Sequence, residues 1–335
     1  ITSMAPGWGS TDGTTTLTVN GKNFGTSGAS VRLEFVRVDG RKFVVTPPTH
    51  SHTSLPNVPM PEGQGRNFTV RVVVSGQTSS GYIRPALHNL RHPKYSGFIS
   101  LGAGDLYLPP LLESLSPTEG PTSGCDIWEE LSVWKARYLL EGGSGRRCKT
   151  PVLLTLTGYS LGIGEALIEI FRDNVWEKIA SDSDSTIADN SRSHTKISFQ
   201  APTGVGKDLK IRLFVGGKLS EGEVKYSFKD PNDVLLRPIP FSAQNENEPL
   251  EILSTDGFGE TKTSVNVTIG SRECKNPLWN PIHRDSGRPY ISCLPSVDVV
   301  GSKSISFNIA GYPFVRNART AMEFNKSIVF SVCMA

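Results

Sequence analysis

The stretch Leu-Thr-Val-Asn-Gly-Lys-Asn-Phe-Gly at residues 17–25 decides the fold of this chain. It begins with alternating apolar and polar residues, as a half-buried strand does, and its glycines permit a turn with positive φ. A related stretch, Leu-Thr-Leu-Thr-Gly-Tyr-Ser-Leu-Gly, occupies residues 154–162. We therefore expect two copies of one strand-and-turn unit, with Phe24 and Tyr159 anchoring the cores of small sandwiches.

The two copies continue in step along the chain. In the first, Ser-His-Thr at 51–53 leads to Pro-Glu-Gly-Gln-Gly at 61–65 and a Val-rich strand at 68–74. In the second, the same order occurs at residues 193–195, 202–206 and 209–215, with spacing that agrees to within one residue. A degenerate third copy covers residues 249–259, 289–295 and 301–309. The repeat period is about 110 residues, which predicts tandem domains.

The composition agrees with a turn-rich β protein. Among 335 residues, 33 are Gly and 23 are Pro, while 37% are hydrophobic, so the chain can build real cores. The net charge of +3 is too small to indicate a nucleic-acid binder. No run of 18 apolar residues occurs, so we expect no direct insertion into a membrane.

One stretch favours a helix. Residues 127–140 place apolar side chains at 127, 131, 134 and 138, close to helical spacing, and Asp126 could cap the first turn. Because this stretch lies between Cys125 and Cys148, we expect a short helical, disulfide-stapled insertion at residues 124–149.

The five cysteines are Cys125, Cys148, Cys274, Cys293 and Cys333. None forms a Cys-x-x-Cys pair, so zinc is not expected. Local pairing of Cys125 with Cys148 and of Cys274 with Cys293 would close loops of about 20 residues, each stabilising by roughly 3 kcal/mol. Cys333 would then need a partner downstream. The alternative is five reduced, buried thiols in a cytosolic protein.

Three sequons support a secretory route. Asn67, Asn266 and Asn325 each begin an Asn-x-Ser/Thr triplet, so N-linked glycans are expected at exposed positions. The chain begins at Ile1 without a signal peptide, and we interpret both of its ends as cuts in a longer polypeptide.

The repeat resembles the IPT/TIG family of immunoglobulin-like domains, found in plexins, some transcription factors and large surface proteins of protists and bacteria. The resemblance rests on Pro6, the Gly-Lys-Asn-Phe-Gly at 21–25 and the Pro-Glu-Gly-Gln-Gly at 61–65. It implies an all-β chain of tandem immunoglobulin-like β-sandwiches. The pair Cys274 and Cys293 is similar to a disulfide that many receptor copies carry.

This interpretation divides the chain into five parts. They are an IPT/TIG-like domain 1 at 1–84, a linker or insertion at 85–110, domain 2 at 111–231 with its insertion at 124–149, a degenerate domain 3 at 232–329, and the start of a cysteine-rich module at 330–335. Binding specificity often lies in insertions at sandwich ends, so residues 84–110 and 125–148 are the first places to seek a partner.

Catalytic and metal-binding patterns were sought at the histidines and in the acidic run. His50 and His52 would face the same side of a strand, and His88 and His92 stand four residues apart. Either pair could ligate a metal, but no Cys or acidic partner stands at the usual spacing. The acidic run at 181–185 lacks the glycine and terminal Glu of an EF-hand loop, which favours a solvated hairpin tip over calcium. We expect no enzyme activity, no cofactor and no metal.

The resulting hypothesis is an extracellular, non-catalytic structural or interaction module at the cell surface, part of a larger protein. Its partners would be other protein chains, including copies of itself in a ciliary surface filament (mastigoneme-like) or coat. The alternative is the ligand-binding or adhesion stalk of a plexin-like receptor. A DNA-binding transcription factor and an accessory domain of a carbohydrate-active enzyme are further classes, and the charge, sequons and cysteines argue against the first.

Overall fold

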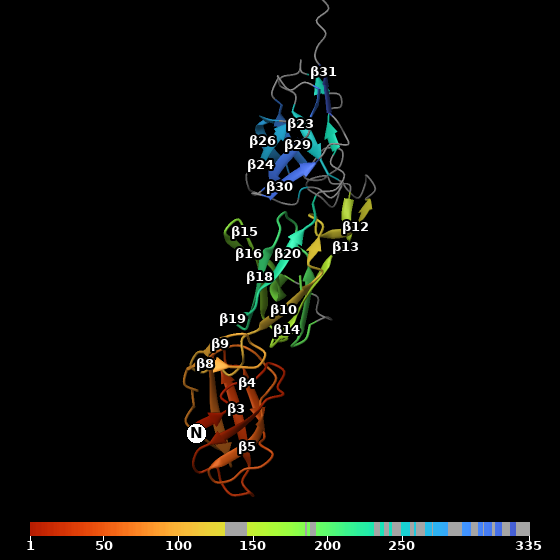
Figure 1. Ribbon diagram of the computed structural model, residues 1–335. Helices are drawn as coiled ribbons and strands as arrows, with labels where there is room; N and C mark the ends of the chain where they lie inside the picture. Colours follow the sequence, from red (N-terminus) through yellow and green to blue (C-terminus); the bar gives the residue numbers. More distant parts are fainter. Residues whose placement is uncertain are drawn as a thin grey trace, which may run out of the picture.

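The computed structural model describes most of the chain, and Figure 1 shows its units one after another along a long axis. The described residues are 1–130, 146–184, 186–187, 192–230, 235–237, 241–242, 249–254, 258, 265–269, 271–280, 290–295, 301–303, 305–309, 312–316 and 322–325. They form many small β-sheets and one 3-10 turn, η1 (Asp182–Asp184), so the chain is all-β as expected. Within these residues, no helix is long and apolar enough to cross a membrane.

The first sandwich packs two sheets, ordered β1-β2-β5 and β4-β3-β6-β7. Its strands are β1 (Ser3–Ala5), β2 (Thr16–Asn20), β3 (Val31–Arg37), β4 (Lys42–Val45), β5 (Ser54–Pro59), β6 (Phe68–Val74) and β7 (Gln77–Thr78). Alternation along β6 turns Phe68, Val70 and Val72 inward, where they meet Leu17 and Val19 of the other sheet. Each such side chain stabilises the fold by about 1.5–3 kcal/mol through burial.

A hairpin follows the first sandwich, formed by β8 (Leu87–Arg91) and β9 (Phe98–Leu101). After it, Leu106 and Tyr107 enter the core of the first sandwich, and the Tyr107 hydroxyl donates to the carbonyl of Pro61 over 2.9 Å. The segment expected as a linker at 85–110 thus contains a hairpin and supplies core residues to its neighbour.

The second sandwich packs the sheet β10-β14-β17 against the sheet β11-β20-β18-β15-β16, with β19 beside β18. Its strands are β10 (Leu111–Ser116), β11 (Glu119–Gly120), β14 (Leu153–Tyr159), β15 (Ala166–Arg172), β16 (Val175–Ser181), β17 (Lys196–Gln200), β18 (Leu209–Val215), β19 (Lys218–Leu219) and β20 (Val224–Phe228). Strand β18 buries Leu209, Ile211, Leu213 and Val215 and turns Lys210 outward, so the strand has period two.

The insertion of the second sandwich contradicts the helix expected at residues 127–140. Residues 127–130 lie in strand β12 (Cys125–Glu130), which pairs antiparallel with β13 (Arg146–Pro151); residues 131–145 lie outside the described part. The disulfide between Cys125 and Cys148 ties these two strands together, so cross-strand pairing overrides the helical spacing of the apolar residues. The insertion is stapled as expected, but it is not helical where it is described.

The third unit has the sheets β21-β23-β27-β26, β25-β24-β29-β30 and β22-β31-β28. Its strands are β21 (Leu235–Arg237), β22 (Phe241–Ser242), β23 (Leu250–Leu253), β24 (Val265–Ile269), β25 (Arg272–Glu273), β26 (Lys275–Asn280), β27 (Tyr290–Leu294), β28 (Gly301–Lys303), β29 (Ile305–Ile309), β30 (Tyr312–Arg316) and β31 (Met322–Asn325). Ile252, Val267 and Ile291 are buried in it. Cys333 and residues 330–335 lie outside the described part.

The strand-and-turn unit recurs at the level of single hydrogen bonds. The amide of Phe24 donates to the carbonyl of His52, and the amide of Leu161 donates to the carbonyl of His194. Both apolar side chains are fully enclosed. The expectation that Tyr159 anchors the second core was therefore wrong: Leu161 fills the place of Phe24, because Tyr159 aligns with the exposed Lys22 two residues before it.

Candidate functional site

The first and second sandwiches meet end to end at a polar junction. His194 of the second sandwich lies between two residues of the first: its Nδ1 is 2.8 Å from the Thr11 hydroxyl and its Nε2 is 2.7 Å from Glu62 Oε1. Nearby, Arg37 Nη2 pairs with Glu165 over 3.0 Å. Both ring nitrogens of His194 therefore have a partner in the first sandwich, and these directional contacts orient the end of the second sandwich against the end of the first.

A buried lysine forms the centre of this junction. Lys218, in β19 of the second sandwich, is only 4% exposed. Its Nζ donates to the carbonyl of Tyr107 over 2.5 Å and lies 3.4 Å from Asp105 Oδ2. Burial lowers the pKa of Lys218 to about 8, and the neighbouring Asp105 opposes that shift. These two contacts join β19 of the second sandwich directly to the segment at residues 105–107.

Arg84 supports the segment that holds Asp105. This buried guanidinium donates from Nε to the carbonyl of Asp105 over 2.9 Å and from Nη2 to the carbonyl of Gly102 over 2.6 Å. Burial lowers its pKa, although Arg84 remains a cation at any physiological pH. The three groups therefore form one buried network at the base of the hairpin.

Close backbone packing completes the contact. Gly216, at φ 53°, approaches the first sandwich so tightly that a Cβ there would lie 2.6 Å from the Gly65 Cα. The Gly164 amide donates to Gln64 Oε1 over 3.1 Å. The turn therefore requires glycine at position 216 for space as well as for its dihedral angle.

An aromatic cluster lies beside the junction and joins three segments. His92 of the hairpin region stacks on Tyr159 of the second sandwich, with ring centroids 5.6 Å apart, and meets Trp8 of the first sandwich edge-on at 5.3 Å. Tyr95 adds a further edge contact and donates its hydroxyl to the carbonyl of Pro109. Burial, and to a lesser extent Lys94, lowers the pKa of His92, which favours the neutral ring. The cluster fixes the hairpin against both sandwiches.

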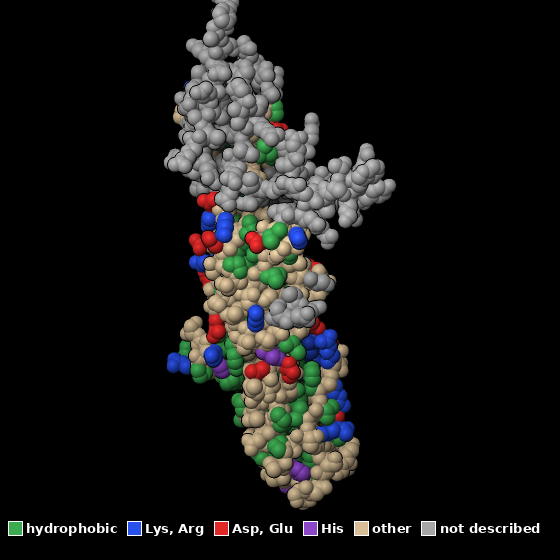
Figure 2. Space-filling model, turned by 90° about the vertical axis from the view of Figure 1, so that its right-hand side faces the viewer, with side chains coloured by type: hydrophobic (Ala, Val, Ile, Leu, Met, Phe, Trp, Pro, Cys, Tyr) green, Lys and Arg blue, Asp and Glu red, His purple; other side chains and the backbone are tan. Residues whose placement is uncertain are grey.

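The outer side of the hairpin carries an open depression of about 600 Å³, lined by Arg91, His92, Pro93, Tyr95, Ser96, Gly97 and Phe98. Phe98 is 58% exposed, and the Arg91 guanidinium carbon lies 4.8 Å from its ring centroid. Figure 2 shows basic, hydrophobic and histidine side chains together on a lobe that projects at the height of this hairpin. The guanidinium and the ring form a cation–π pair at the surface.

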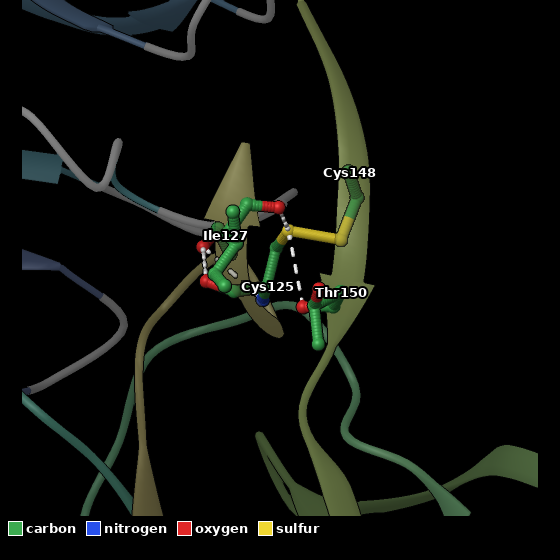
Figure 3. Close-up of a disulfide and its surroundings, with 5 residues drawn as sticks. Cys125, Ile127, Cys148 and Thr150 are labelled. Carbon is green, nitrogen blue, oxygen red and sulfur yellow. Dashed lines mark hydrogen bonds between the residues drawn. A yellow bond between two sulfur atoms is a disulfide. The ribbon is translucent and has the colours of Figure 1, made fainter. Parts of the chain in front are cut away.

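Both expected disulfide pairs are present among the described residues. Cys125 joins Cys148, and Cys274 joins Cys293, with Cα atoms 5.8 Å apart in each pair. Figure 3 shows Cys125 Sγ close to the carbonyl oxygens of Ile127 and Thr150, at 3.1 Å and 3.6 Å. Because a disulfide sulfur carries no proton, we regard these approaches as packing contacts rather than hydrogen bonds.

Two sequon asparagines have described surroundings. Asn67 is exposed at φ 58° directly before β6, and Asn266 is exposed on β24. Asn325 ends β31, and its side chain lies outside the described part. Asn67 and Asn266 therefore offer accessible amides for a glycan.

Comparisons with known proteins identify the first sandwich. A model of the IPT/TIG domain matches residues 1–84. Residues 1–84 are an IPT/TIG domain. No curated protein matches the chain.

Solved structures resemble the chain only distantly. The plexin A4 extracellular region is 14% identical with a TM-score of 0.24, covering 92% of this chain and 32% of its own. The surface glycan-binding protein PbSGBP-B of Prevotella bryantii is 12% identical with a TM-score of 0.30, covering 66% of this chain and 38% of its own. A marsupial T cell receptor is 12% identical with a TM-score of 0.21, covering 94% and 98%. The chain thus spans about a third of the plexin chain.

Two further residues considered for chemistry, Asp184 and His50, have structural partners. Outside the IPT/TIG domain, Asp184 of the acidic run pairs with Lys178 over 2.7 Å, and this contact, with serine hydroxyls, lowers the pKa of Asp184. Within the IPT/TIG domain, His50 Nε2 lies 2.7 Å from the carbonyl oxygen of Thr26. Among the described residues, no cluster of three His, Cys, Asp or Glu side chains could hold a metal ion.

Nothing in the residue pattern alone marks Lys218, Asp105 or Gly216 as junction residues. One signal was available: where the IPT/TIG domain has Ser-Gly-Gln at 75–77, the second sandwich has Gly-Gly-Lys at 216–218. Gly216 replaces Ser75 and Lys218 replaces Gln77, and these two differences distinguish the turn that packs against the first sandwich.

Proposed function

We propose that the chain is a non-catalytic extracellular module of a larger surface protein, whose tandem sandwiches form a stiff unit that presents interaction surfaces. The junction between the first two sandwiches is the observation that supports a stiff unit most strongly. There Lys218 and His194 form hydrogen bonds to the first sandwich and the segment after it, and Gly216 packs tightly against Gly65. An ordinary flexible linker between domains needs none of these.

The compartment is inferred from covalent chemistry. Structural disulfides form and persist in oxidising environments and are rare in the cytosol. The chain has two, each closing a short loop, and Asn67 and Asn266 are accessible for glycosylation. Together they favour a secreted or cell-surface location, within which the ciliary surface is our finer proposal.

Within this class, a subunit of a mastigoneme-like surface filament or coat is the finer proposal. A stiff unit with distinct surfaces can repeat in an open assembly when each copy contacts the next through different patches. The stalk of a plexin-like receptor is the alternative, in which the unit acts as a spacer.

Expression of the chain through a secretory pathway tests the compartment. We expect non-reducing peptide mapping to recover both disulfides, and an endoglycosidase-sensitive mass that falls in Asn67→Gln and in Asn266→Gln. Asn57→Gln, another exposed asparagine at positive φ but outside any sequon, is the matched control. Free Cys125 and Cys274 without any glycan would refute the extracellular proposal. Negative-stain microscopy of the native, full-length protein then separates filaments from isolated stalks.

A further inference from the structure

The outer side of the hairpin is a basic surface without internal partners. We define the hairpin surface as Arg91, Pro93, Lys94 and Phe98, all exposed. No Asp or Glu occurs between residues 83 and 104. Within the described part of the chain, neither Arg91 nor Lys94 forms an ion pair, and the guanidinium of Arg91 lies over the Phe98 ring. An exposed ring beneath the guanidinium of Arg91, with the unpaired Lys94 in the same hairpin, fits an acidic surface.

The second sandwich contains a groove of the opposite character. It lies between β10 and β20, has a volume of about 610 Å³, and has the apolar Leu115 and Val224 among its lining residues. β10 is the end strand of its sheet, and its Leu112 amide donates to the carbonyl of Glu221 just before β20, so the groove lies beside that contact. We call it the edge groove.

Acidic side chains border the edge groove. Glu119 and Asp208 are exposed there and form no ion pair in the described part of the chain. Glu223 is shared between Lys210, at 3.0 Å, and Lys225, at 3.3 Å. Even with Lys225 in the lining, carboxylates outnumber cations at this groove, so its charge is complementary to the hairpin surface.

We propose that the hairpin surface of one copy docks into the edge groove of a second copy of this chain. The Phe98 ring would enter the groove above the buried Leu115 and Val224, while Arg91 and Lys94 would meet Glu119 and Asp208. The hairpin cannot turn back onto its own groove, because His92 and Tyr95 are held in the aromatic cluster with Trp8 and Tyr159. The contact is therefore between copies.

This docking joins two different patches, so it is heterologous, and a heterologous contact that does not close into a ring extends into a filament. The inference rests on the proposed function and adds to it the identity of the partner and the two contacting surfaces. It also gives a role to the segment at residues 84–110, which the sequence marks as extra to the repeat.

Sedimentation velocity of the full chain at low salt tests the proposal. We expect concentration-dependent self-association that weakens about tenfold or more in Arg91→Glu/Lys94→Glu, because attraction becomes repulsion at two positions. Glu119→Lys/Asp208→Lys should weaken it similarly. Lys22→Glu/Lys275→Glu, which reverses two exposed cations outside the hairpin surface and the edge groove, is the matched control and should associate like the unmodified chain.

Mixing the two reversed variants gives the decisive result. Each fails alone, but the mixture offers an unmodified hairpin to an unmodified groove and a reversed hairpin to a reversed groove, so association should return. Association that resists either reversal, or a mixture that stays dissociated, would overturn the proposal. A chain that remains monomeric at every concentration, or whose hairpin binds heparin instead, would overturn it too, while the disulfide, glycan and microscopy results would still decide the proposed function separately.

Discussion

The first two sandwiches contain the same turn, but only the second uses it to hold a neighbour. In the first, His52 and Lys22 are exposed. In the second, His194 bonds to Thr11 and Glu62, and Tyr159 stacks on His92. The backbone hydrogen bonds of the two turns agree, so the difference lies in the side chains and in what faces them.

A second pair of turns shows the same contrast more sharply. Ser75 at φ 47° and Gly216 at φ 53° occupy matching positions after matching strands. Two residues later, Gln77 is exposed whereas Lys218 is buried. The two sandwiches therefore share one fold, and the turn of the second contacts a neighbour because of two substitutions. Gly216 lacks the Cβ of Ser75, and Lys218 places a long cation where the first sandwich has Gln77.

The largest expected effect comes from making the second turn like the first. Gly216→Ser introduces the residue that the first sandwich tolerates at nearly the same φ, so the turn itself should form. Its Cβ would lie 2.6 Å from the Gly65 Cα, and overpacking of this kind costs about 1–3 kcal/mol. We expect the junction to open, seen as a broader distance distribution in small-angle X-ray scattering.

Ser75→Gly is the matched control for that variant, because it changes only the open turn and leaves the junction intact. If Gly216→Ser and Ser75→Gly gave the same scattering profile and melting temperature as the unmodified chain, the two ends would not be packed as described.

The next largest effect is a pH dependence of the free energy of unfolding, which should arise from Lys218 in the turn of the second sandwich. Because burial lowers the pKa of Lys218 to about 8, the unfolded chain binds more protons than the folded chain between about pH 8 and the ordinary lysine value. The free energy of unfolding should therefore rise with pH in this window, by roughly 2 kcal/mol up to about pH 10. Below pH 8 the cost of the buried cation is fully present.

Urea denaturation across this range measures the effect. Lys218→Met should flatten the rise, while Lys22→Met, at an exposed lysine, should leave it unchanged. Above about pH 10 the curve should turn downward, since burial raises the pKa of Tyr95 and Tyr107 and unfolded tyrosines ionise first. An equal slope in Lys218→Met and the unmodified chain would contradict the burial of this charge.

Much of the fold could be predicted from the sequence, because strand alternation and glycine turns are local signals. The two errors also have local causes. Residues 127–130 have apolar residues at helical spacing, yet a disulfide and a partner strand hold them extended. Tyr159 is the aromatic residue nearest to the place of Phe24, but the turn hydrogen bonds put Leu161 there.

The junction could not be predicted, because it depends on contacts between residues far apart in the chain. Lys218 and Tyr107 are separated by 111 positions, and His194 and Thr11 by 183. Neither lysine nor histidine reveals by itself whether a neighbouring domain covers it. Comparing the aligned repeats is the best available guide to the junction, because it shows which side chains differ at positions where the backbone conformation is the same.

The smallest expected effect is a difference in the free energy of unfolding between alanine variants of His194 and His52, which occupy matching positions in the two sandwiches. His194→Ala removes bonds to Thr11 and Glu62 and should lower the free energy of unfolding by about 1 kcal/mol. His52→Ala should change it by less than about 0.5 kcal/mol, as exposed substitutions do. A double-mutant cycle of His194→Ala with Glu62→Ala should give a positive coupling energy, because the two side chains contact each other directly. Additive effects in that cycle, or equal losses at the two histidines, would mean that the junction is held by Lys218 and backbone packing alone, and the contrast between the two turns would then rest on positions 216 and 218.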